Sequence, residues 1–538
     1  MKGFDFSKVL CWATLAMPAI FPLYLLKFEV FGAPVNVVEV AVYVLFLMFV
    51  FEVFRKRFFW RLKVVLKVGL VKFFIPVVLL ILGAFGGVYA GWVSGDMKMA
   101  LGIFKGWVLM PILYAIILYY VALFDCGRIR LFRAYMLGAL VLGFWALWQV
   151  VTGDYITIDM RASGPFESAN YLALYIAPAV LISFGYVLYG LKQRKIYGYE
   201  LLVFLVLAVA MVFSKSYGGL IGLFGGGFVY ILFMFKSWWK RFSVVGALVL
   251  AGVVVVLLQI GTTKFDDFLA FERQSSSSVR LQVWEVAENL IYERPLMGIG
   301  LGQYQGLYET RAEEILGVAP YEPSMLHPHN LWLSTWLNSG VLGLFGLCWL
   351  IVSFFYVYRR GIMSRYSRGF VLMLLAMFVV ILLHSLVDQH FWKNDLALLW
   401  WMVVVSIFGS GNQIIEGVIV KGVGLGTKIG YPTINILMKK DVSLKGVYVC
   451  SVEVGDDALG EVGKHYYGAG FVGTKDGLKG QYICEVYLFG KCGKIYGKEA
   501  KVLLMKRIRE GRKIKDSKEL KKLIDSDVQF SKKYLKIN

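Results

Sequence analysis

The sequence predicts a multi-domain chain, in which a polytopic α-helical membrane part precedes a separate water-soluble domain. Apolar runs of roughly 17 to 25 residues, each long enough to cross a bilayer as a helix, recur from residue 8 to residue 409 and then stop. From residue 411 onward there are 24 Lys and Arg against 14 Asp and Glu, and the apolar residues fall into short alternating runs separated by glycines. We therefore divide the chain into a membrane part, residues 1–410, and a soluble domain, residues 411–538.

The composition excludes an ordinary soluble globule, because 58% of the residues are hydrophobic and only 17% are charged. A net charge of +21 would suggest nucleic acid as the partner of a soluble protein. Here many of the basic residues lie in short loops between apolar runs, where they set topology and face anionic lipid. The bilayer is therefore the expected partner, and nucleic acid is not. The six cysteines form no CxxC pair, so neither disulfides nor a zinc site is predicted.

Hydropathy predicts about twelve transmembrane helices, of which the first is a retained helix rather than a cleaved signal peptide. They cover residues 8–26, 36–54, 73–92, 99–124, 133–151, 170–190, 200–213, 218–235, 243–260, 331–357, 369–389 and 395–409.

An even number of spans puts both ends of the chain on one side of the membrane. The basic connections all fall on that same side: 55–72, 126–133, 191–199, 236–241 and 359–368. The positive-inside rule makes this side cytoplasmic. We expect a multi-pass protein of the inner (cytoplasmic) membrane with its N- and C-termini in the cytoplasm.

Three connections on the opposite face are expected to converge outside: residues 152–170, residues 214–219 and a large loop, residues 261–330. His329 lies where this large loop enters the tenth span, so it is a candidate general base beside an anion site. Arg161 and Arg280 are candidates for that anion site, although ordinary loop arginines would look the same. His327, flanked by Pro328, is interpreted as a structural neighbour of His329.

Polar residues inside the predicted spans have a structural interpretation first. Lys105, in the fourth span, is expected to snorkel or to pair with a neighbour. His384 and Asp388 are spaced i,i+4 in the eleventh span, which predicts a buried polar pair on one helical face that ties helices together. A catalytic role for this pair remains an alternative, because ionisable groups at membrane depth are often functional.

Three motifs in the membrane part together resemble the O-antigen ligase and polymerase family of membrane glycosyltransferases. His329-Asn330 is followed nine residues later by Gly340-Val-Leu-Gly343, a PLxGxG stretch begins at Pro295, and a serine-containing turn runs Ser214-Lys-Ser-Tyr-Gly218. The resemblance covers roughly residues 35 to 409.

That resemblance implies a metal-independent transfer, without cofactor, of a glycan from an undecaprenyl-pyrophosphate carrier to an acceptor glycan or lipid on the outer face. It gives His329 the role of general base, and it gives Arg161 and Arg280 the binding of the lipid pyrophosphate. Ligases and chain polymerases share these motifs, so both remain open. A membrane transporter or scaffold is the alternative; a transporter would be expected to show internal repeats, which the sequence lacks.

The soluble domain opens with a glycine-rich stretch that contains Gly422, Gly424, Gly426 and Gly430 and continues Tyr-Pro-Thr433-Ile-Asn435. Glycine-rich turns let backbone amides approach phosphates closely, because no side chain intervenes. The stretch lacks the Walker spacing, and a glycine-rich hairpin of a small barrel would look similar.

The order of the motifs that follow is more specific. It resembles riboflavin kinase over the whole domain, including the G-x-P-T-x-N signature that ends at Asn435, a Cys484-Glu485 strand and an Arg507-Ile-Arg509 segment before a final helix. The resemblance implies a six-stranded antiparallel β-barrel of riboflavin kinase type, packed by C-terminal helices. The stretch after Gly473-Thr474 departs from the family in lacking a proline. No nucleotidyltransferase segment precedes the domain, so FAD synthesis is not predicted.

The chemistry implied by this second resemblance is phosphoryl transfer from ATP to riboflavin, which yields FMN. Thr433 and Asn435 would offer oxygen ligands to Mg²⁺ and the phosphates, beneath the loop of glycines between residues 422 and 430. Glu485 would be the base for the ribityl hydroxyl. Arg509 would close over the nucleotide or flavin, or be a solvated helix charge. The alternative is a non-catalytic flavin- or nucleotide-binding regulatory tail.

Overall fold

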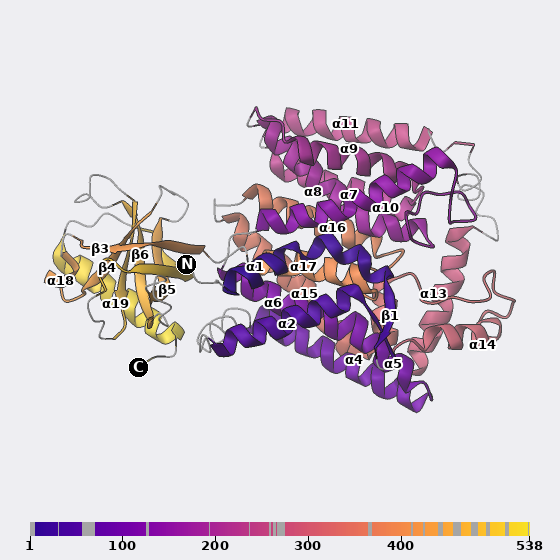
Figure 1. The fold of residues 1–538 in the computed structure, drawn as a ribbon, viewed down its shortest axis with the longest axis horizontal. Helices are drawn as coiled ribbons and strands as arrows, with labels where there is room; N and C mark the ends of the chain where they lie inside the picture. Colours follow the sequence, from indigo (N-terminus) through magenta and orange to yellow (C-terminus); the bar gives the residue numbers. More distant parts are fainter. Residues whose placement is uncertain are drawn as a thin grey trace.

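The computed structural model describes most of the 538-residue chain. The described segments are residues 6–30, 32–55, 70–124, 128–192, 194–235, 237–257, 260–261, 265, 275–363, 368–409, 413–422, 425–438, 445–455, 464–474, 482–490, 495–511, 516–535 and 537. Figure 1 shows a large helical body with a small barrel at one end and the helices α13 and α14 at the other.

The helical body follows the predicted spans closely. Its elements in chain order are α1 (Phe6–Ala16), η1 (Met17–Leu25), the hairpin strands β1 (Lys27–Val30) and β2 (Ala33–Asn36), α2 (Val37–Arg55), η2 (Leu70–Phe74), α4 (Ile75–Val93), α5 (Met97–Ile103), η3 (Phe104–Leu109), α6 (Met110–Phe124), α7 (Arg128–Thr152), α8 (Ala169–Lys192), α9 (Gly198–Phe213), α10 (Tyr217–Met234), α11 (Trp238–Leu257), α13 (Ser276–Glu293), α14 (Tyr304–Leu316), α15 (Leu331–Met363), α16 (Arg368–His384) and α17 (Asn394–Gly409).

Within the described residues, nine helical segments are long and apolar enough to cross a membrane. Three shorter apolar helices, Gly198–Phe213, Gly369–His384 and Asn394–Phe408, stand where the remaining three spans are predicted. The predicted polytopic helical fold is therefore confirmed. Lys105 lies within η3 and pairs with Glu39, whose Oε1 is 3.1 Å from its Nζ, as expected for a cation placed among apolar residues.

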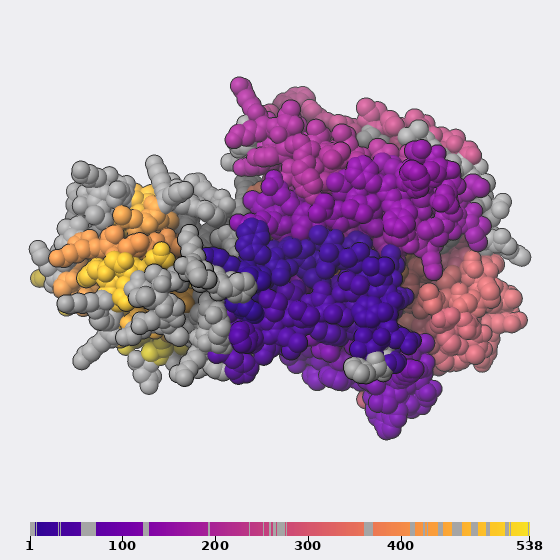
Figure 2. Space-filling model, viewed as in Figure 1, coloured from indigo at the N-terminus to yellow at the C-terminus, as the bar shows by residue number. Residues whose placement is uncertain are grey.

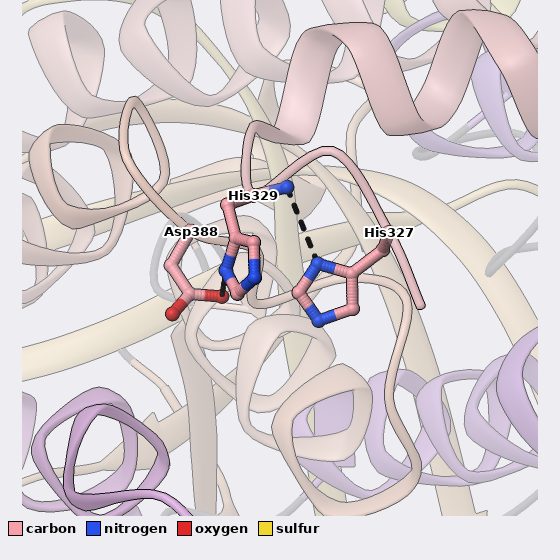
Figure 3. Close-up of side chains that lie close together, drawn as sticks. All are labelled: His327, His329 and Asp388. Atoms are coloured by element: carbon pink, nitrogen blue, oxygen red, sulfur yellow. Dashed lines mark hydrogen bonds and ion pairs between the residues drawn. The ribbon is translucent and has the colours of Figure 1, made fainter. Parts of the chain in front are cut away.

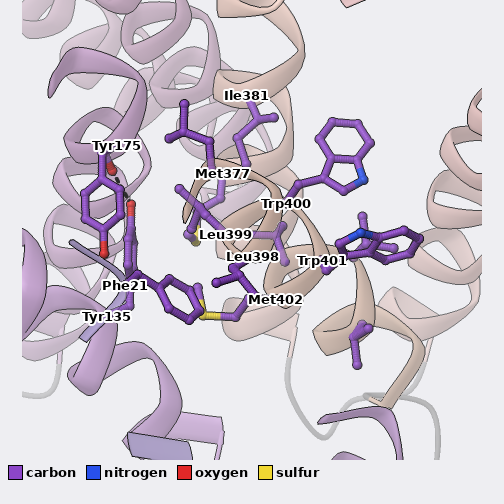
Figure 4. Close-up of a cluster of buried hydrophobic side chains, with 14 of the residues drawn as sticks. Phe21, Tyr135, Tyr175, Met377, Ile381, Leu398, Leu399, Trp400, Trp401 and Met402 are labelled. Carbon is purple, nitrogen blue, oxygen red and sulfur yellow. Dashed lines mark hydrogen bonds between the residues drawn. The ribbon is translucent and has the colours of Figure 1, made fainter. Parts of the chain in front are cut away.

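The short helix α17 is the centre of the body. Its residues from Leu396 to Ile407 are almost all fully buried (Figure 4). Of its two indoles, Trp400 packs on Phe378 of α16 and Trp401 on Phe73 of η2. A helix that is apolar on every face is stable only when other helices or lipid surround it. Hydropathy alone predicts α17 as one more span. In the structure its uniform hydrophobicity reflects burial inside the bundle.

A glycine-rich loop holds α4 against α15. In the stretch that begins at Pro295, Ile299 N donates to Leu337 O of α15 at 2.9 Å, and Leu301 N donates to Gly87 O of α4 at 3.1 Å. Gly300 between them has φ +109°, and a Cβ placed there would lie 2.7 Å from the backbone nitrogen of Gly91. The glycines of this motif are therefore required by packing, because the loop backbone is wedged between two helices.

The C-terminal domain is a closed antiparallel barrel with the strand order β3-β4-β7-β6-β5-β8, which confirms the predicted fold. Its strands are β3 (Gln413–Val420), β4 (Thr433–Leu437), β5 (Gly446–Gly455), β6 (Lys464–Thr474), β7 (Tyr482–Leu488) and β8 (Glu499–Arg509). Alternate residues such as Ile434, Ile436 and Val486 fill the interior, so their neighbours in sequence point outward. Closure leaves no free strand edge.

One described helix, α19 (Ser517–Leu535), covers the outside of β5 and β6. The barrel holds it through Arg509, whose Nη2 is 2.7 Å and whose Nε is 3.0 Å from the carboxylate of Asp527. Asp527 is 7% exposed in its side chain. The structure therefore places Arg509 in an ion pair that fastens α19 to the barrel.

The space-filling view shows the same order of parts (Figure 2). The orange and yellow barrel and the salmon surface of α13 and α14 lie at opposite ends of the helical body. The barrel and the large loop that contains α13 and α14 are thus separated by the length of the apolar helices.

We predict that Gly300→Ala destabilises the protein by about 2 kcal/mol or more, because the added Cβ both strains a left-handed backbone and strikes α4. Thermal unfolding of the purified full chain in detergent measures this. Gly306→Ala in α14, where a Cβ meets nothing within 4 Å, is the control and should be neutral or slightly stabilising. Equal melting temperatures for the two variants would contradict the wedge.

We predict that Asp527→Asn lowers the free energy of unfolding of the barrel by about 1–3 kcal/mol, since it leaves a half-buried guanidinium without its carboxylate. Glu510→Gln is the matched control, because the Glu510 side chain is 85% exposed and sits 3.7 Å from Arg507. That change should shift stability by less than about 0.5 kcal/mol. A lower melting temperature for Asp527→Asn than for Glu510→Gln would support this role of the ion pair, and equal melting temperatures would contradict it.

Candidate functional sites

The outer site is organised by the turn of residues 385–393, which joins α16 to α17. The prediction that His384 and Asp388 share one helical face is wrong: α16 ends at His384, and Asp388 lies in the turn beyond it. The sequence does carry a signal for this. Asp388, Gln389, His390 and Lys393 crowd into a short stretch between two apolar runs, which is typical of a connection rather than of a continuing span.

Three successive carbonyls of this turn receive hydrogen bonds from other elements. Ser385 O accepts from Leu331 N at 3.0 Å. Leu386 O accepts from Asn330 Nδ2 at 3.1 Å, and Val387 O accepts from Arg280 Nε at 3.0 Å. Carbonyls left free at a helix end need such donors where water is scarce. The large loop is thereby fixed onto the turn.

Asn330 and Trp284 position the His-Pro-His segment between them. Asn330 Oδ1 caps α15 by accepting from Trp332 N at 2.9 Å. Trp284 Nε1, one turn after Arg280 in α13, donates to Pro328 O at 2.9 Å. Asn330 thus has a structural role, because its hydrogen bonds fix the backbone next to His329.

His329 faces the carboxylate of Asp388 (Figure 3). Its Nδ1 lies 3.6 Å from Asp388 Oδ1, and its backbone adopts a left-handed φ of +48°. Such a backbone is unfavourable for a residue with a side chain and is often found at functional sites. Asp388 is 3% exposed. A buried carboxylate beside an imidazole can orient the ring and stabilise its protonated form.

Burial and nearby charges shift the pKa values of His327 and Asp388. Burial, with the nearby charges of His329 and Lys393, lowers the pKa of His327 well below its usual value, so that ring stays neutral. Burial by itself would raise the pKa of Asp388. The contact with His329 and the nearby Lys393 outweigh burial and hold that pKa well below its usual value. Asp388 is therefore ionised at neutral pH.

Arg280 lies beside Asp388, and Arg161, from another outer segment, is near enough to Arg280 for the two charges to interact. Burial lowers the pKa of Arg280, Asp388 opposes that shift, and the positive charge of Arg161 adds to it. Arg161 contacts Asp159, and its Nη1 lies 3.4 Å from Asn170 Oδ1. The two outer segments thus bring the guanidinium of Arg280 next to Asp388 and that of Arg161 within range of Arg280.

Two further cations lie near this cluster and were not singled out by sequence. Lys393, at the end of the turn, sits over the ring of Tyr171 with 4.3 Å from Nζ to the ring centroid. Tyr171 in turn donates to Asp395 at 2.5 Å. Lys215 has a left-handed φ of +47° between the buried Ser214 and Ser216, in the turn whose Gly218 packs on His384. The site is therefore rich in positive charge, as an anionic substrate requires.

His327, His329 and Asp388 offer ligand atoms that lie within 4.8 Å of one another, the spacing of a metal site. However, His327 Nδ1 accepts the backbone N–H of His329 at 3.2 Å. In the neutral ring the other nitrogen then carries the proton and has no lone pair to give. This leaves His329 and Asp388, fewer ligands than a zinc site uses. The arrangement suits proton transfer better than metal binding.

The second site lies on the outer face of the barrel, between β4 and β7. Register pairs Thr433 with Tyr487 and Asn435 with Glu485, so the four side chains share one face. Thr433 Oγ1 donates to Glu485 Oε1 at 2.6 Å. Thr433 and Glu485, predicted from separate motifs, are therefore in direct contact.

Asn435 is buried, and its Oδ1 has no hydrogen-bond partner within the described part of the protein. Gly422 lies directly against its amide, because a Cβ on Gly422 would be 2.2 Å from Asn435 Nδ2. A buried oxygen without a donor is unfavourable unless a ligand or ion meets it. Asn435 and Gly422 thus form a cradle for a cation or phosphate.

The glycine loop covers this cradle from α18 (Leu425–Lys428) to Tyr431. Tyr431 N donates to Gly426 O at 2.7 Å, which closes the loop, and Gly430 has φ +93°. Tyr431 also bonds through its hydroxyl to Asp525 of α19. Gly424 lies outside the described residues. The helix that Arg509 fastens to the barrel thus also contacts the loop.

Comparisons with known proteins match two separate parts of the chain. Residues 202–348 match the O-antigen ligase family model, and residues 411–535 match the riboflavin kinase family model. The first match includes Arg280 and His329, and the second includes Thr433, Asn435 and Glu485.

Curated relatives fall into the same two groups. A protein named as a polysaccharide ligase from Rickettsia conorii is 25% identical over 43% of this chain and 52% of its own length. Bifunctional riboflavin kinase/FMN adenylyltransferases are 30% identical in Buchnera aphidicola, over 23% of this chain and 39% of the relative, and 36% identical in Escherichia coli K12, over 21% and 35%. The chain thus spans about half the length of the ligase relative and about two fifths of the Buchnera one.

A crystal structure titled as a macrolide-efflux protein from Streptococcus pneumoniae aligns with 23% of this chain and 39% of its own at 27% identity, but its TM-score of 0.20 supports no comparison of folds. The two family matches and the two folds agree. Residues 202–348 of the helical body thus match an O-antigen ligase domain, and residues 411–535, which include the barrel, match a riboflavin kinase domain.

Proposed function

We propose that the chain is a bifunctional enzyme, with a riboflavin kinase at its C-terminal end and a lipid-linked glycan transferase in its helical part. The kinase proposal rests above all on the contact between Thr433 and Glu485 beside the oxygen of Asn435, for which the described residues offer no donor. The transferase proposal rests on the pairing of His329 with Asp388 beside two arginines.

In the kinase, Glu485 takes the proton from the 5′-hydroxyl of riboflavin as its oxygen attacks the γ-phosphorus of ATP. The bond from that phosphorus to the bridging oxygen breaks, so FMN and ADP are the products. The hydroxyl of Thr433 holds the Glu485 carboxylate in place before substrate arrives. Positioning and charge neutralisation supply most of the catalysis in such transfers.

Mg²⁺ with ATP fits the residues present. Asn435 Oδ1 is buried without a donor, and Thr433 Oγ1 retains lone pairs after donating to Glu485. These two oxygens would hold the ion, which when bound neutralises phosphate charge. The glycine loop from residue 422 to residue 430 would approach the phosphates through its backbone.

In the transferase, His329 removes the proton from an acceptor hydroxyl, whose oxygen then attacks the anomeric carbon of the glycan. The bond from that carbon to the pyrophosphate breaks, and undecaprenyl pyrophosphate leaves. Arg161 and Arg280 would bind its phosphates, and Asp388 would stabilise protonated His329. His327 is the weaker candidate base, because its pKa is lowered and its Nδ1 is engaged.

We further propose that the protein resides in the inner membrane with both termini in the cytoplasm. The basic connections between spans support this orientation, as does the location of the barrel and of α13–α14 at opposite ends of the body. ATP and riboflavin would then reach the barrel, and lipid-linked glycans would meet His329 on the far side.

We predict that Glu485→Gln lowers the rate of FMN formation about 10²- to 10⁴-fold, because it removes the proton acceptor but keeps the hydrogen bond from Thr433. The assay uses the purified full chain with riboflavin, ATP and Mg²⁺. Glu416→Gln, at an exposed position on β3, is the control and should leave the rate unchanged. FMN formation unaffected by Glu485→Gln would leave only a binding or regulatory role for the barrel.

We predict that His329→Ala abolishes transfer of glycan from undecaprenyl pyrophosphate, and that Asp388→Asn lowers its rate about 10²-fold or more, because the imidazolium loses its counter-charge. Transfer is measured in membranes from a radiolabelled lipid-linked donor. Glu309→Gln, on the exposed face of α14, is the control. Undiminished transfer by His329→Ala would favour the transporter or scaffold alternative.

A further inference from the structure

Helix α15 is broken at Gly340, and a loop of the outer segment fills the break. Gly340 has φ +62° and ψ −169°, a conformation that is essentially restricted to glycine. In an unbroken helix Val341 N would donate to Leu337 O. Here the loop partners both groups: Val341 N donates to Leu296 O at 3.1 Å, and Leu337 O accepts from Ile299 N at 2.9 Å. The loop backbone therefore replaces the hydrogen bond that the break removes.

The place of the break along α15 gives its depth in the bilayer. The stretch from Gly340 to Arg359 rises roughly 28 Å as a helix, close to the thickness of about 30 Å of a hydrocarbon core. Basic residues mark the far end of this stretch, because Lys72 lies over the ring of Tyr356 with 4.9 Å from Nζ to the ring centroid. With Arg359 and Lys72 at one edge of the core, the break in α15 lies near the opposite edge.

Exposed aromatic side chains mark the same level on α4. Gly300 of the loop lies against Gly91, since a Cβ on Gly300 would be 2.7 Å from Gly91 N. On either side of Gly91, the side chains of Tyr89 and Trp92 are more than half exposed, and their rings meet edge to face. Tyrosine and tryptophan are enriched where a bilayer meets water. Helix rise and aromatic residues thus agree that the loop lies at the outer membrane–water boundary.

Two apolar side chains of the loop extend the lipid-facing surface of α15. Leu296 is 73% and Met297 is 53% exposed, although a Cβ on Gly340 would touch the backbone of both. Val341 and Phe345, which follow the break on α15, are exposed as well. A membrane-spanning helix turns such an apolar face to the acyl chains. Because the loop adjoins this face at the edge of the core, the same acyl chains are within its reach.

We propose that residues 294–300 form a shallow re-entrant membrane anchor, in which Leu296 and Met297 enter the acyl chains of the outer leaflet. The bilayer is the one partner that this surface needs, because the surface continues that of a span. Backbone that enters a membrane must have its polar groups partnered by protein. The break in α15 meets this requirement through Leu337 and Val341.

The anchor also sets the height of His329, and this part of the inference rests on the proposed glycan transfer. The stretch of α15 from Leu331 to Gly340 rises roughly 14 Å as a helix. The headgroup layer on each side of a bilayer is roughly 5 to 8 Å thick. An anchor at Gly340 thus holds His329 just beyond the headgroups, where the sugar of a lipid-linked pyrophosphate stands.

Spin labels on the full chain in nanodiscs test the depth of the loop. The labels are attached at Met297→Cys, Phe345→Cys or Val318→Cys in a chain whose six natural cysteines are replaced by alanine. We expect the label at Met297→Cys to behave as at the lipid-facing Phe345→Cys, with accessibility to a water-soluble nickel chelate about fivefold lower than at Val318→Cys. Val318 is the matched control, because it follows α14, is apolar and is 57% exposed.

Equal nickel accessibility at Met297→Cys and Val318→Cys would overturn the anchor, whether or not the chain transfers glycans. If the cysteine-free chain does not fold, a photo-crosslinking phenylalanine analogue at position 297 of the otherwise native chain replaces the label. Crosslinks to radiolabelled phospholipid from position 297 and none from position 318 support the anchor, and equal yields overturn it.

The height of His329 has a separate test. Met297→Asp should lower transfer from the lipid-linked donor about tenfold or more at unchanged thermal stability in detergent, because a charge drives the loop out of the acyl chains. Val318→Asp should leave transfer unchanged. Undiminished transfer by Met297→Asp would overturn the role of the anchor in positioning. Failure of the wild-type chain to transfer any glycan would contradict the proposed function instead, and the spin labels would still decide the depth of the loop.

Discussion

Three backbone carbonyls at the end of α16 require hydrogen-bond donors, and the outer half of the protein is arranged around supplying them. Ser385, Leu386 and Val387 follow the end of the helix, where backbone carbonyls have no partner within the helix itself. Leu331, Asn330 and Arg280 provide those donors. Because the donors belong to the large loop and to the start of α15, meeting this requirement brings Asp388 up to His329 and an arginine beside both. A site for acid–base chemistry on an anionic substrate follows from a rule about backbone polar groups.

The barrel meets a comparable requirement in a different setting. Closure satisfies its strand edges and fills its interior with apolar side chains, which leaves the outward-facing residues of β4 and β7 available for chemistry. Thr433 and Glu485 satisfy each other, whereas the oxygen of Asn435 has no donor among the described residues around the glycine loop. In both sites, a neighbouring polar residue fixes the position of a candidate site residue. Asn330 fixes the backbone next to His329, and Thr433 holds the carboxylate of Glu485.

Sequence patterns predicted most of the fold because the patterns are local. A span is a run of apolar residues, so the apolar helices could be placed from spacing alone, whereas the six-stranded barrel is what the resemblance to riboflavin kinase implies. The errors occur where a residue's neighbours are distant in sequence. The i,i+4 spacing that places Asp388 on a helical face is a local signal, whereas the turn after His384 is held by residues 56 and 107 positions earlier. The ion pair of Arg509 with Asp527 of α19 is likewise a contact that no local pattern indicates.

By itself, the sequence determined that this chain has a membrane-spanning helical part and a soluble barrel. It also identified candidate site residues, namely His329, Arg280, Thr433, Asn435 and Glu485. Hydrophobic periodicity and motif order carry that information, since both are written along the chain. Only the tertiary structure decided which of those residues meet. The carboxylate that His329 faces and the donor that Glu485 accepts from are set by packing between segments far apart in sequence. A linear pattern does not record such contacts, because they form only when the free carbonyls, buried oxygens and close-packed glycines of different segments are satisfied together.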